Sequence, residues 1–206
     1  MFFVGFTVCI PTTHINEGMR VMKRTTVIVL GLVLCAVPLF AQGGMIAIFA
    51  DPGGTDCAIY DTQANKIVQV YVVHMFAPEA NCAQFSVPVP ECAFGLTWLS
   101  DDYVFPINVG ESPTGIALCR GVCYSSPFHI LTINYWGMGT SLDCCVLTVE
   151  PDPREVPPVL IMTDCNHDIH TAIGGSAIIN PDETCPCLNV PLEETTWGRV
   201  KAMYLE

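Results

Sequence analysis

The stretch Lys66-Ile-Val-Gln-Val-Tyr-Val-Val-His74 decides the fold class. Its central valines alternate with Gln69 and Tyr71, so in an extended chain the valines share one face and the larger polar side chains share the other. β-branched residues also favour strands because they pack well on a pleated surface. The stretch therefore predicts a β-strand with one face in a hydrophobic core.

Similar alternation, or a short apolar run between turn residues, recurs along the chain. The predicted strands are residues 45–50, 66–74, 82–87, 115–118, 129–135, 145–149, 159–163 and 177–179. Turn sequences rich in glycine and proline, such as Asp51-Pro-Gly-Gly and Gly110-Glu-Ser-Pro, separate them. This pattern predicts an all-β protein, an immunoglobulin-like or related Greek-key β-sandwich.

The N-terminal region has the pattern of an export signal. Met22-Lys-Arg is followed by an apolar run over residues 27–34 and a small residue at Ala41. We predict that residues 1–21 are an over-extended start outside the fold, and that residues 22–41 are a signal peptide cleaved after Ala41. The run is too short to span a bilayer, so we expect a secreted, periplasmic or cell-surface protein with no membrane span after cleavage.

The composition argues against a nucleic-acid partner and predicts how the cysteines are used. The 206 residues are 51% hydrophobic, enough for a core, and the net charge of -12 argues against a nucleic-acid partner. No cofactor is predicted. Two of the twelve cysteines precede the predicted cleavage point, and an even number in an exported chain predicts disulfides. The ten candidates are Cys57, Cys82, Cys92, Cys119, Cys123, Cys144, Cys145, Cys165, Cys185 and Cys187.

Two expectations about disulfide pairing follow from where the cysteines lie in the sequence. Cys144 and Cys145 are neighbours in a predicted strand, so they should point to opposite faces and reach different partners, one inward and one outward. Cys165 is expected to pair with Cys185 or Cys187, across the strands that follow the proline-rich segment.

We predict one sandwich domain over residues 42–194. Residues 150–158 contain four prolines, which exclude a helix or a central strand and predict an exposed connection between the two sheets. The final stretch, residues 195–206, has apolar side chains at helical spacing and is predicted to be a short C-terminal helix or an extended tail.

The sequence Asp164-Cys-Asn-His-Asp-Ile-His170 is the strongest candidate for a metal site. Imidazole and carboxylate groups suit Zn²⁺ or Cu²⁺. The candidate ligands are Asp164, Asn166, His167, Asp168 and His170. The favoured interpretation is a polar turn beside a disulfide, with the carboxylate bound to backbone donors and both imidazoles in solvent.

Other chemical motifs are less complete. Cys185-Pro-Cys187 has the short spacing of a redox pair, but neighbouring acids would raise a thiol pKa rather than lower it. Gly110-Glu-Ser-Pro-Thr114 lacks the final glycine of a nucleophile elbow and is interpreted as a β-turn. Asp101 and Asp102 are interpreted as solvated turn acids rather than a glycosidase pair.

Several short motifs together resemble a family. They are the sequence Gly54-Thr-Asp-Cys57, the Cys144-Cys145 pair, Cys185-Pro-Cys187 and the tail Thr196-Trp-Gly-Arg-Val-Lys-Ala-Met-Tyr204. The chain resembles uncharacterised secreted, cysteine-rich β-sandwich proteins of environmental bacteria. The resemblance implies an exported protein with a β-sandwich fold, and it implies no activity.

The sequence thus predicts an exported, non-enzymatic structural, surface-associated or binding module, whose partner would be a protein or a surface glycan. The alternatives are a metal-binding protein or metalloenzyme centred on residues 164–170, and a thiol-disulfide oxidoreductase that uses Cys185 and Cys187.

Overall fold

The computed structural model describes residues 44–77 and 79–187, and this part of the chain is built from β-strands. The elements are β1 (Met45–Phe49), β2 (Ala58–Ile59), β3 (Lys66–Met75), β4 (Ala80–Phe85), the 3₁₀ turn η1 (Glu91–Ala93), β5 (Leu96–Tyr103), β6 (Ile107–Glu111), β7 (Gly115–Tyr124), β8 (Phe128–Gly137), β9 (Cys145–Thr148), β10 (Ile161–Thr163), β11 (Ile169–Thr171), β12 (Ile173–Gly174) and β13 (Ser176–Ile179). The predicted signal peptide and C-terminal helix lie outside the described residues.

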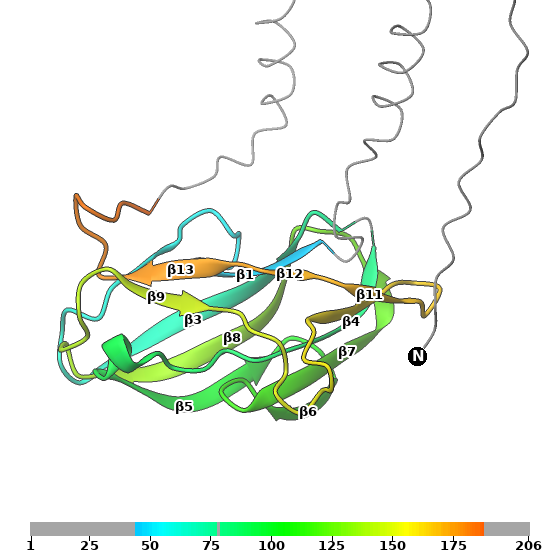
Figure 1. Ribbon diagram of the computed structural model, residues 1–206, viewed down its shortest axis with the longest axis horizontal. Coiled ribbons are helices and arrows are strands. Elements are labelled where there is room, and N and C mark those ends of the chain that lie inside the picture. The colour runs from blue at the N-terminus through cyan, green and yellow to red at the C-terminus, as the bar shows by residue number, and fades with distance from the viewer. Residues whose placement is uncertain (1–43, 78, 188–206) are drawn as a thin grey trace, which may run out of the picture. The chain divides into compact units, whose positions relative to one another are not determined.

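Two five-stranded sheets form the sandwich (Figure 1). The first sheet has the order β12-β1-β3-β8-β5, and the second has the order β11-β10-β4-β7-β6. A third set, β2-β13-β9, continues from the first sheet because β12 and β13 are separated only by Gly175. The chain crosses between the sheets repeatedly, as from β3 to β4 and from β7 to β8, which is the connectivity of Greek-key and jelly-roll sandwiches. The predicted all-β, disulfide-linked sandwich is confirmed.

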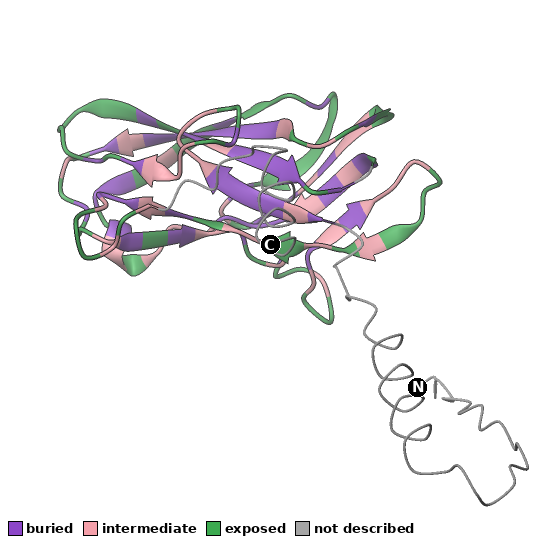
Figure 2. Cartoon of the chain, turned by 90° about the horizontal axis from the view of Figure 1, so that it is seen from above, coloured by how far each residue is buried: buried purple, intermediate pink, exposed green. Residues whose placement is uncertain are grey.

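The core lies between the inner faces of the two sheets, and burial alternates along the strands (Figure 2). On β3, Val68, Val70 and Val72 are buried, whereas Ile67 and Gln69 are exposed, as the alternation predicts. The second sheet contributes Phe85, Ile116 and Leu118, each fully buried. The inner faces therefore supply apolar area whose removal from water stabilises the fold by about 25 cal/mol per Å².

Strands β5 and β6 carry no predicted strand in the sequence analysis. In β5 the register shifts between Trp98 and Ser100, and this bulge interrupts the period of two. β5 also contains Asp101 and Asp102, and acidic residues are rare in strands. The interpretation of these two residues as solvated turn acids was wrong, because both lie in β5 and Asp101 is buried.

All ten predicted cysteines are paired in five disulfides. The pairs are Cys57–Cys187, Cys82–Cys119, Cys92–Cys145, Cys123–Cys165 and Cys144–Cys185. Cys144 and Cys145 do reach different partners, and Cys145 is the buried one. The expected pairing of Cys165 was wrong. The β10–β11 turn that carries Cys165 lies beside the end of β7, so its partner is Cys123 in the second sheet.

The proline-rich segment leads from β9 to β10 in the second sheet, and Glu150 forms a β-bridge with Ser86 at its start. Among the described residues, no helix is long and apolar enough to cross a membrane.

Candidate binding face

The outer face of the second sheet carries two rows of side chains that run across all five strands. Cα pairing places Ile107 opposite Cys119, Cys119 opposite Cys82, Cys82 opposite Thr163, and Thr163 opposite Ile169. The next row is Val109, Ala117, Gln84, Ile161 and Thr171. We refer to these ten residues as the apolar face. Their neighbours along β4 and β7, among them Phe85 and Leu118, point into the core, so the ten point outward.

Both edge strands of this face, β6 and β11, expose large aliphatic side chains. Ile107 is 56% exposed, Val109 is 63% exposed and Ile169 is 73% exposed. Only Gln84, Thr163 and Thr171 add polar groups to the two rows. A contiguous exposed apolar area rimmed by polar residues is typical of an interaction surface.

A disulfide crosses the middle of the apolar face. Cys82 and Cys119 are directly opposite each other on β4 and β7, with Cα atoms 4.1 Å apart. A covalent link at this position fixes the spacing of the two central strands. It also contributes compact apolar sulfur surface instead of a flexible side chain, so the face is held in one shape before any partner arrives.

The proline-rich segment is hydrogen-bonded to one edge of this face. The Gln84 amide donates to Asp152 Oδ2 at 3.0 Å and to Glu155 Oε1 at 2.8 Å. Arg154 Nε donates to Asp152 Oδ1 at 2.9 Å, and this hydrogen bond lowers the pKa of the fully buried Asp152 carboxyl to about 2. Beside the Asp152–Arg154 pair, this edge carries two further carboxyl groups, those of Glu155 and of Glu111 at the end of β6.

At the opposite edge, four of the five residues proposed as metal ligands, Asp164, Asn166, His167 and Asp168, lie in the turn between β10 and β11, and the fifth, His170, lies in β11. Asp164 Oδ1 accepts hydrogen bonds from the backbone N–H groups of Asn166 at 2.8 Å and Asp168 at 2.9 Å. The side chains of Asn166, His167 and Asp168 are exposed. The turn interpretation is supported for Asp164, whose carboxylate is occupied by the local backbone.

One part of that interpretation was wrong. His170 is only partly exposed, and its Nε2 lies 3.0 Å from Asp164 Oδ2, so this imidazole is not free in solvent. The reason is register: His170 is opposite Met162 across the β10–β11 pair, on the side that faces the sandwich. Its hydrogen bond holds the pKa of the Asp164 carboxyl below the usual value.

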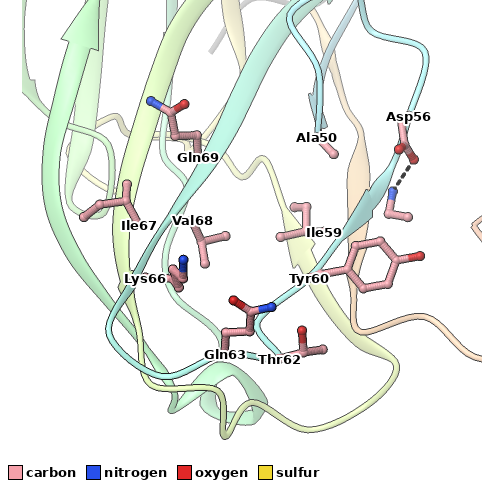
Figure 3. Close-up of a pocket in the computed structure, with 11 residues that line it drawn as sticks. Ala50, Asp56, Ile59, Tyr60, Thr62, Gln63, Lys66, Ile67, Val68 and Gln69 are labelled. Carbon is pink, nitrogen blue, oxygen red and sulfur yellow. Dashed lines mark hydrogen bonds between the residues drawn. The ribbon is translucent and has the colours of Figure 1, made fainter.

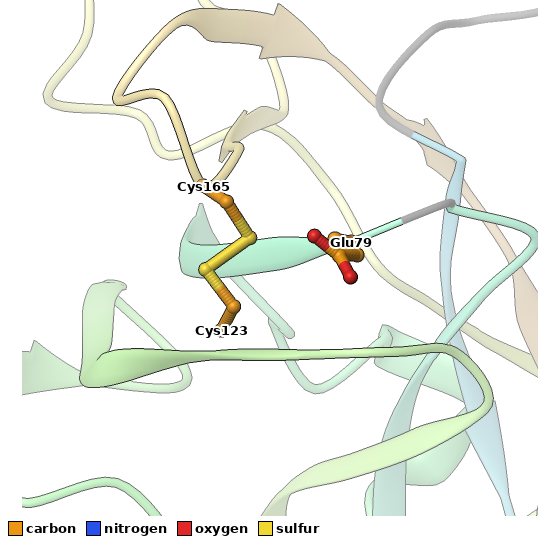
Figure 4. Close-up of side chains that lie close together, drawn as sticks. All are labelled: Glu79, Cys123 and Cys165. Carbon is orange, nitrogen blue, oxygen red and sulfur yellow. A yellow bond between two sulfur atoms is a disulfide. The ribbon is translucent and has the colours of Figure 1, made fainter.

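Within the described residues, two other clusters bring three potential metal ligands together. One is Glu79 with Cys123 and Cys165 (Figure 4), and the other is Cys144, Asp182 and Cys185. In both, the two sulfur atoms are joined in a disulfide and are not the thiolates that ligate metals. Asp164, His167, Asp168 and His170 do not converge as a set of three donors.

The redox motif is also divided between partners. Cys185 is bonded to Cys144, and Cys187 is bonded to Cys57. A thiol-disulfide enzyme cycles one disulfide within its motif, and this arrangement does not contain it.

The outer face of the first sheet is different in kind, because its polar side chains bind one another. Asn134 on β8 is the centre: its Oδ1 accepts from the Gln69 amide at 3.0 Å, and its Nδ2 donates to Asp102 Oδ2 at 2.9 Å. Nearby, Thr132 Oγ1 and His129 Nε2 lie 3.0 Å apart. We refer to this as the polar face.

Asp101, on the inner side of β5, has a structural role. Its carboxylate accepts hydrogen bonds from Ser112 N at 2.8 Å, from Ser112 Oγ at 2.7 Å and from Trp98 Nε1 at 3.1 Å. Sequence reasoning missed this role because Ser112 follows β6, which belongs to the second sheet, whereas Asp101 lies in the first. The two residues meet only when the two sheets pack together.

Comparison with known proteins gives structural matches only. No protein-family model and no curated protein matches the chain. The cohesin module of a Clostridium perfringens family 33 glycoside hydrolase matches at 6% identity, with 66% of this chain and 98% of that chain covered and a TM-score of 0.42. A non-cellulosomal cohesin from Archaeoglobus fulgidus matches at 11% identity, with 66% and 89% covered and a TM-score of 0.44. The sixth cohesin of Acetivibrio cellulolyticus scaffoldin B, solved with a Cel5 dockerin, matches at 14% identity, with 66% and 97% covered and a TM-score of 0.44.

Proposed function

We propose that this chain is an exported, non-enzymatic binding module that holds a partner protein on the apolar face. The observation that carries the proposal is the pair of rows centred on the Cys82–Cys119 disulfide, with Ile107, Val109 and Ile169 exposed. Ten paired cysteines suit an oxidising compartment, which supports the predicted export. Burying three such side chains at an interface would contribute several kcal/mol, because each apolar side chain contributes about 1.5–3 kcal/mol on full burial.

The charge around the face defines the partner further. The chain carries a net charge of -12, and acidic groups border the face at Glu111, Glu155 and Asp168. A complementary partner presents an apolar strip flanked by lysine or arginine, because opposite charges at the rim speed association and orient the two surfaces.

Selection from a phage-displayed library of random peptides tests this proposal without a known partner. The full oxidised chain serves as bait, with Ile107→Asp as the test variant. Ile67→Asp is the matched control, because Ile67 is 51% exposed against 56% for Ile107 but lies on the first sheet.

We expect the selected peptides to combine apolar and basic residues, to bind the wild type and the Ile67→Asp variant equally, and to bind the Ile107→Asp variant at least about tenfold more weakly, since 1.4 kcal/mol corresponds to a factor of ten. Peptides that bind Ile107→Asp as well as they bind the wild type would place binding elsewhere and refute the proposal.

A surface glycan is the second candidate partner, and one observation favours it. The polar face places the half-buried rings of Tyr71 and Trp136 near the amides of Gln69 and Asn134. Aromatic rings and planar hydrogen-bonding groups suit sugars, which have apolar ring faces and polar edges. A Trp136→Ala variant that loses binding on a glycan array, with Ile107→Asp unaffected, would support this candidate.

A further inference from the structure

The first sheet contains a pocket between β2 and the first half of β3 (Figure 3). β1 pairs with β3 only from Tyr71 to Met75. β2 follows β1 along the chain, but among the described residues it pairs with β13 alone. The earlier residues of β3 therefore have a partner strand, β8, on one side only. The space that this leaves has a volume of about 460 Å³, which is within the range of small-molecule sites.

The pocket is bounded at both ends. At one end, Phe49 of β1 is opposite Tyr71 of β3, and Ala50 lines the pocket. At the other end, Asp61 is 1% exposed, and its carboxylate accepts a hydrogen bond from Ser141 Oγ at 2.6 Å. This bond holds the connection between β2 and β3 against the loop after β8. The pocket therefore suits a compact ligand better than an extended chain that passes through it.

Backbone groups line both sides of the pocket. The carbonyl oxygens of Cys57 and Ile59 accept hydrogen bonds from β13 and from the residue after it, so the peptide groups of the alternate residues, Ala58 and Tyr60, are directed to the pocket. On β3, the peptide group of Gln69 is directed to the same side as those that pair with β1, two residues further on. These groups give a ligand hydrogen-bond donors and acceptors at fixed positions.

The side chains supply an apolar floor, an exposed ring and two charged ends. Ile59 and Val68 are buried and form the floor. Tyr60 is 58% exposed and lines the mouth. Figure 3 shows Lys66 at one end of the pocket and Asp56 at the other. An apolar floor with a few converging polar groups is the usual form of a small-ligand site.

Lys66 is the cation of this pocket, and the described chain does not neutralise it. The described ranges contain three lysine or arginine residues. Arg154 is paired with Asp152. Cζ of Arg120 lies 4.6 Å from the centre of the Phe128 ring. Among the described residues Lys66 has no carboxylate within ion-pair distance. Its ammonium group is therefore available to an anionic group of a ligand.

We propose that this pocket binds a single acidic sugar unit, a six-membered ring that carries one carboxylate. The carboxylate pairs with Lys66, and the apolar face of the ring packs on Tyr60. The ring hydroxyls donate to Asp56 and bond with the amides of Gln63 and Gln69. The site goes beyond the binding proposed for the apolar face, because it lies in the first sheet.

NMR titration of the full oxidised chain with glucuronate at neutral pH tests the proposal. Glucose is the neutral comparison, because it has a hydroxymethyl group in place of the carboxylate, and acetate is the comparison without the ring. Lys66→Gln is the test variant. Arg120→Gln is the matched control, because it removes the same charge from the second sheet. Ile107→Asp separates this site from the apolar face.

We expect glucuronate to shift the amides of Ala58, Tyr60 and Gln69 until they saturate, with a dissociation constant of about 1 mM, because so small a ligand makes few contacts. Lys66→Gln should weaken binding at least about tenfold, because a charged hydrogen bond is lost. Arg120→Gln and Ile107→Asp should bind like the wild type. Glucose and acetate should each bind at least about tenfold more weakly than glucuronate.

Each of several results would overturn the proposal. Glucose that binds as tightly as glucuronate would exclude recognition of the carboxylate, and acetate that binds as tightly would exclude recognition of the ring. Equal weakening by Lys66→Gln and Arg120→Gln would show only an effect of overall charge. Loss of binding in Ile107→Asp, or the absence of a saturable shift at Ala58, Tyr60 and Gln69, would exclude this pocket as the site.

Discussion

The two outer faces of the sandwich follow the same alternation rule and yet have opposite character. On the polar face the outward side chains bind one another, with Asn134 joined to Gln69 and Asp102. On the apolar face the outward residues are mostly aliphatic, and the central pair, Cys82 and Cys119, is covalently linked. The two faces differ in what they leave exposed. The hydrogen-bonded network of the polar face satisfies its own polar groups, whereas the aliphatic face, whose central strands are linked by a disulfide, leaves apolar surface that a partner can cover.

The largest effect that separates the faces is expected from the disulfide. Replacing both Cys82 and Cys119 by alanine should lower the free energy of unfolding by about 2–4 kcal/mol, because the unfolded chain regains conformational freedom over a 37-residue separation. Guanidinium unfolding of the oxidised proteins measures it. A loss below about 1 kcal/mol would mean that the strand ladder alone fixes this face.

On the polar face, Asn134→Ala should lower the free energy of unfolding by about 1–3 kcal/mol. Asn134 is 8% exposed, and its removal leaves the Gln69 amide and the Asp102 carboxylate without their partner in a partly buried setting. Thr171→Ala on the apolar face is the control and should change stability by less than about 0.5 kcal/mol. Similar costs for the two variants would show that the polar network does not stabilise the sheet.

The edge of the apolar face should respond to acid. The pKa of Asp152 is lowered to about 2 in the folded state from 3.8, so its contribution is present above about pH 4 and is lost as the pH falls toward 2. The urea midpoint of the wild type should therefore fall more between pH 4 and pH 2 than that of Asp152→Asn. Parallel acid profiles for the two proteins would contradict this assignment.

The smallest expected effect on stability comes from the exposed isoleucines. Ile107→Asp and Ile67→Asp should each lower the free energy of unfolding by about 1 kcal/mol, because both side chains are only about half buried. Thermal unfolding checks this. A large loss in either variant would mean that the side chain supports the fold, and binding differences could then not be assigned to its surface.

The fold was predictable to the extent that alternation was regular. The period of two around Val70 predicted β3, and similar patterns predicted β4 and β8. β5 was missed because a bulge after Trp98 shifts the period and Asp101 and Asp102 suggest a turn. Periodicity reports which side a residue faces only while the ladder is regular.

The candidate site was harder to predict from sequence. The apolar face is assembled from five strands, and only the register brings Ile107 into one row with Ile169. Local reasoning did find the turn at Asp164, because its bonds are to backbone groups two and four residues away. It missed the Cys123–Cys165 pairing, which joins β7 to the β10–β11 turn across the sheet.

The most direct test of the central claim is NMR shift mapping with a peptide selected against the wild type. If the apolar face is the binding surface, the amides that shift on titration lie on β4, β6, β7, β10 and β11, and Val109 and Ile169 are among the most perturbed. The amides of β3, β5 and β8 should stay unchanged. Shifts centred on Gln69, Asn134 and Trp136 instead would place the binding surface on the polar face and contradict the account.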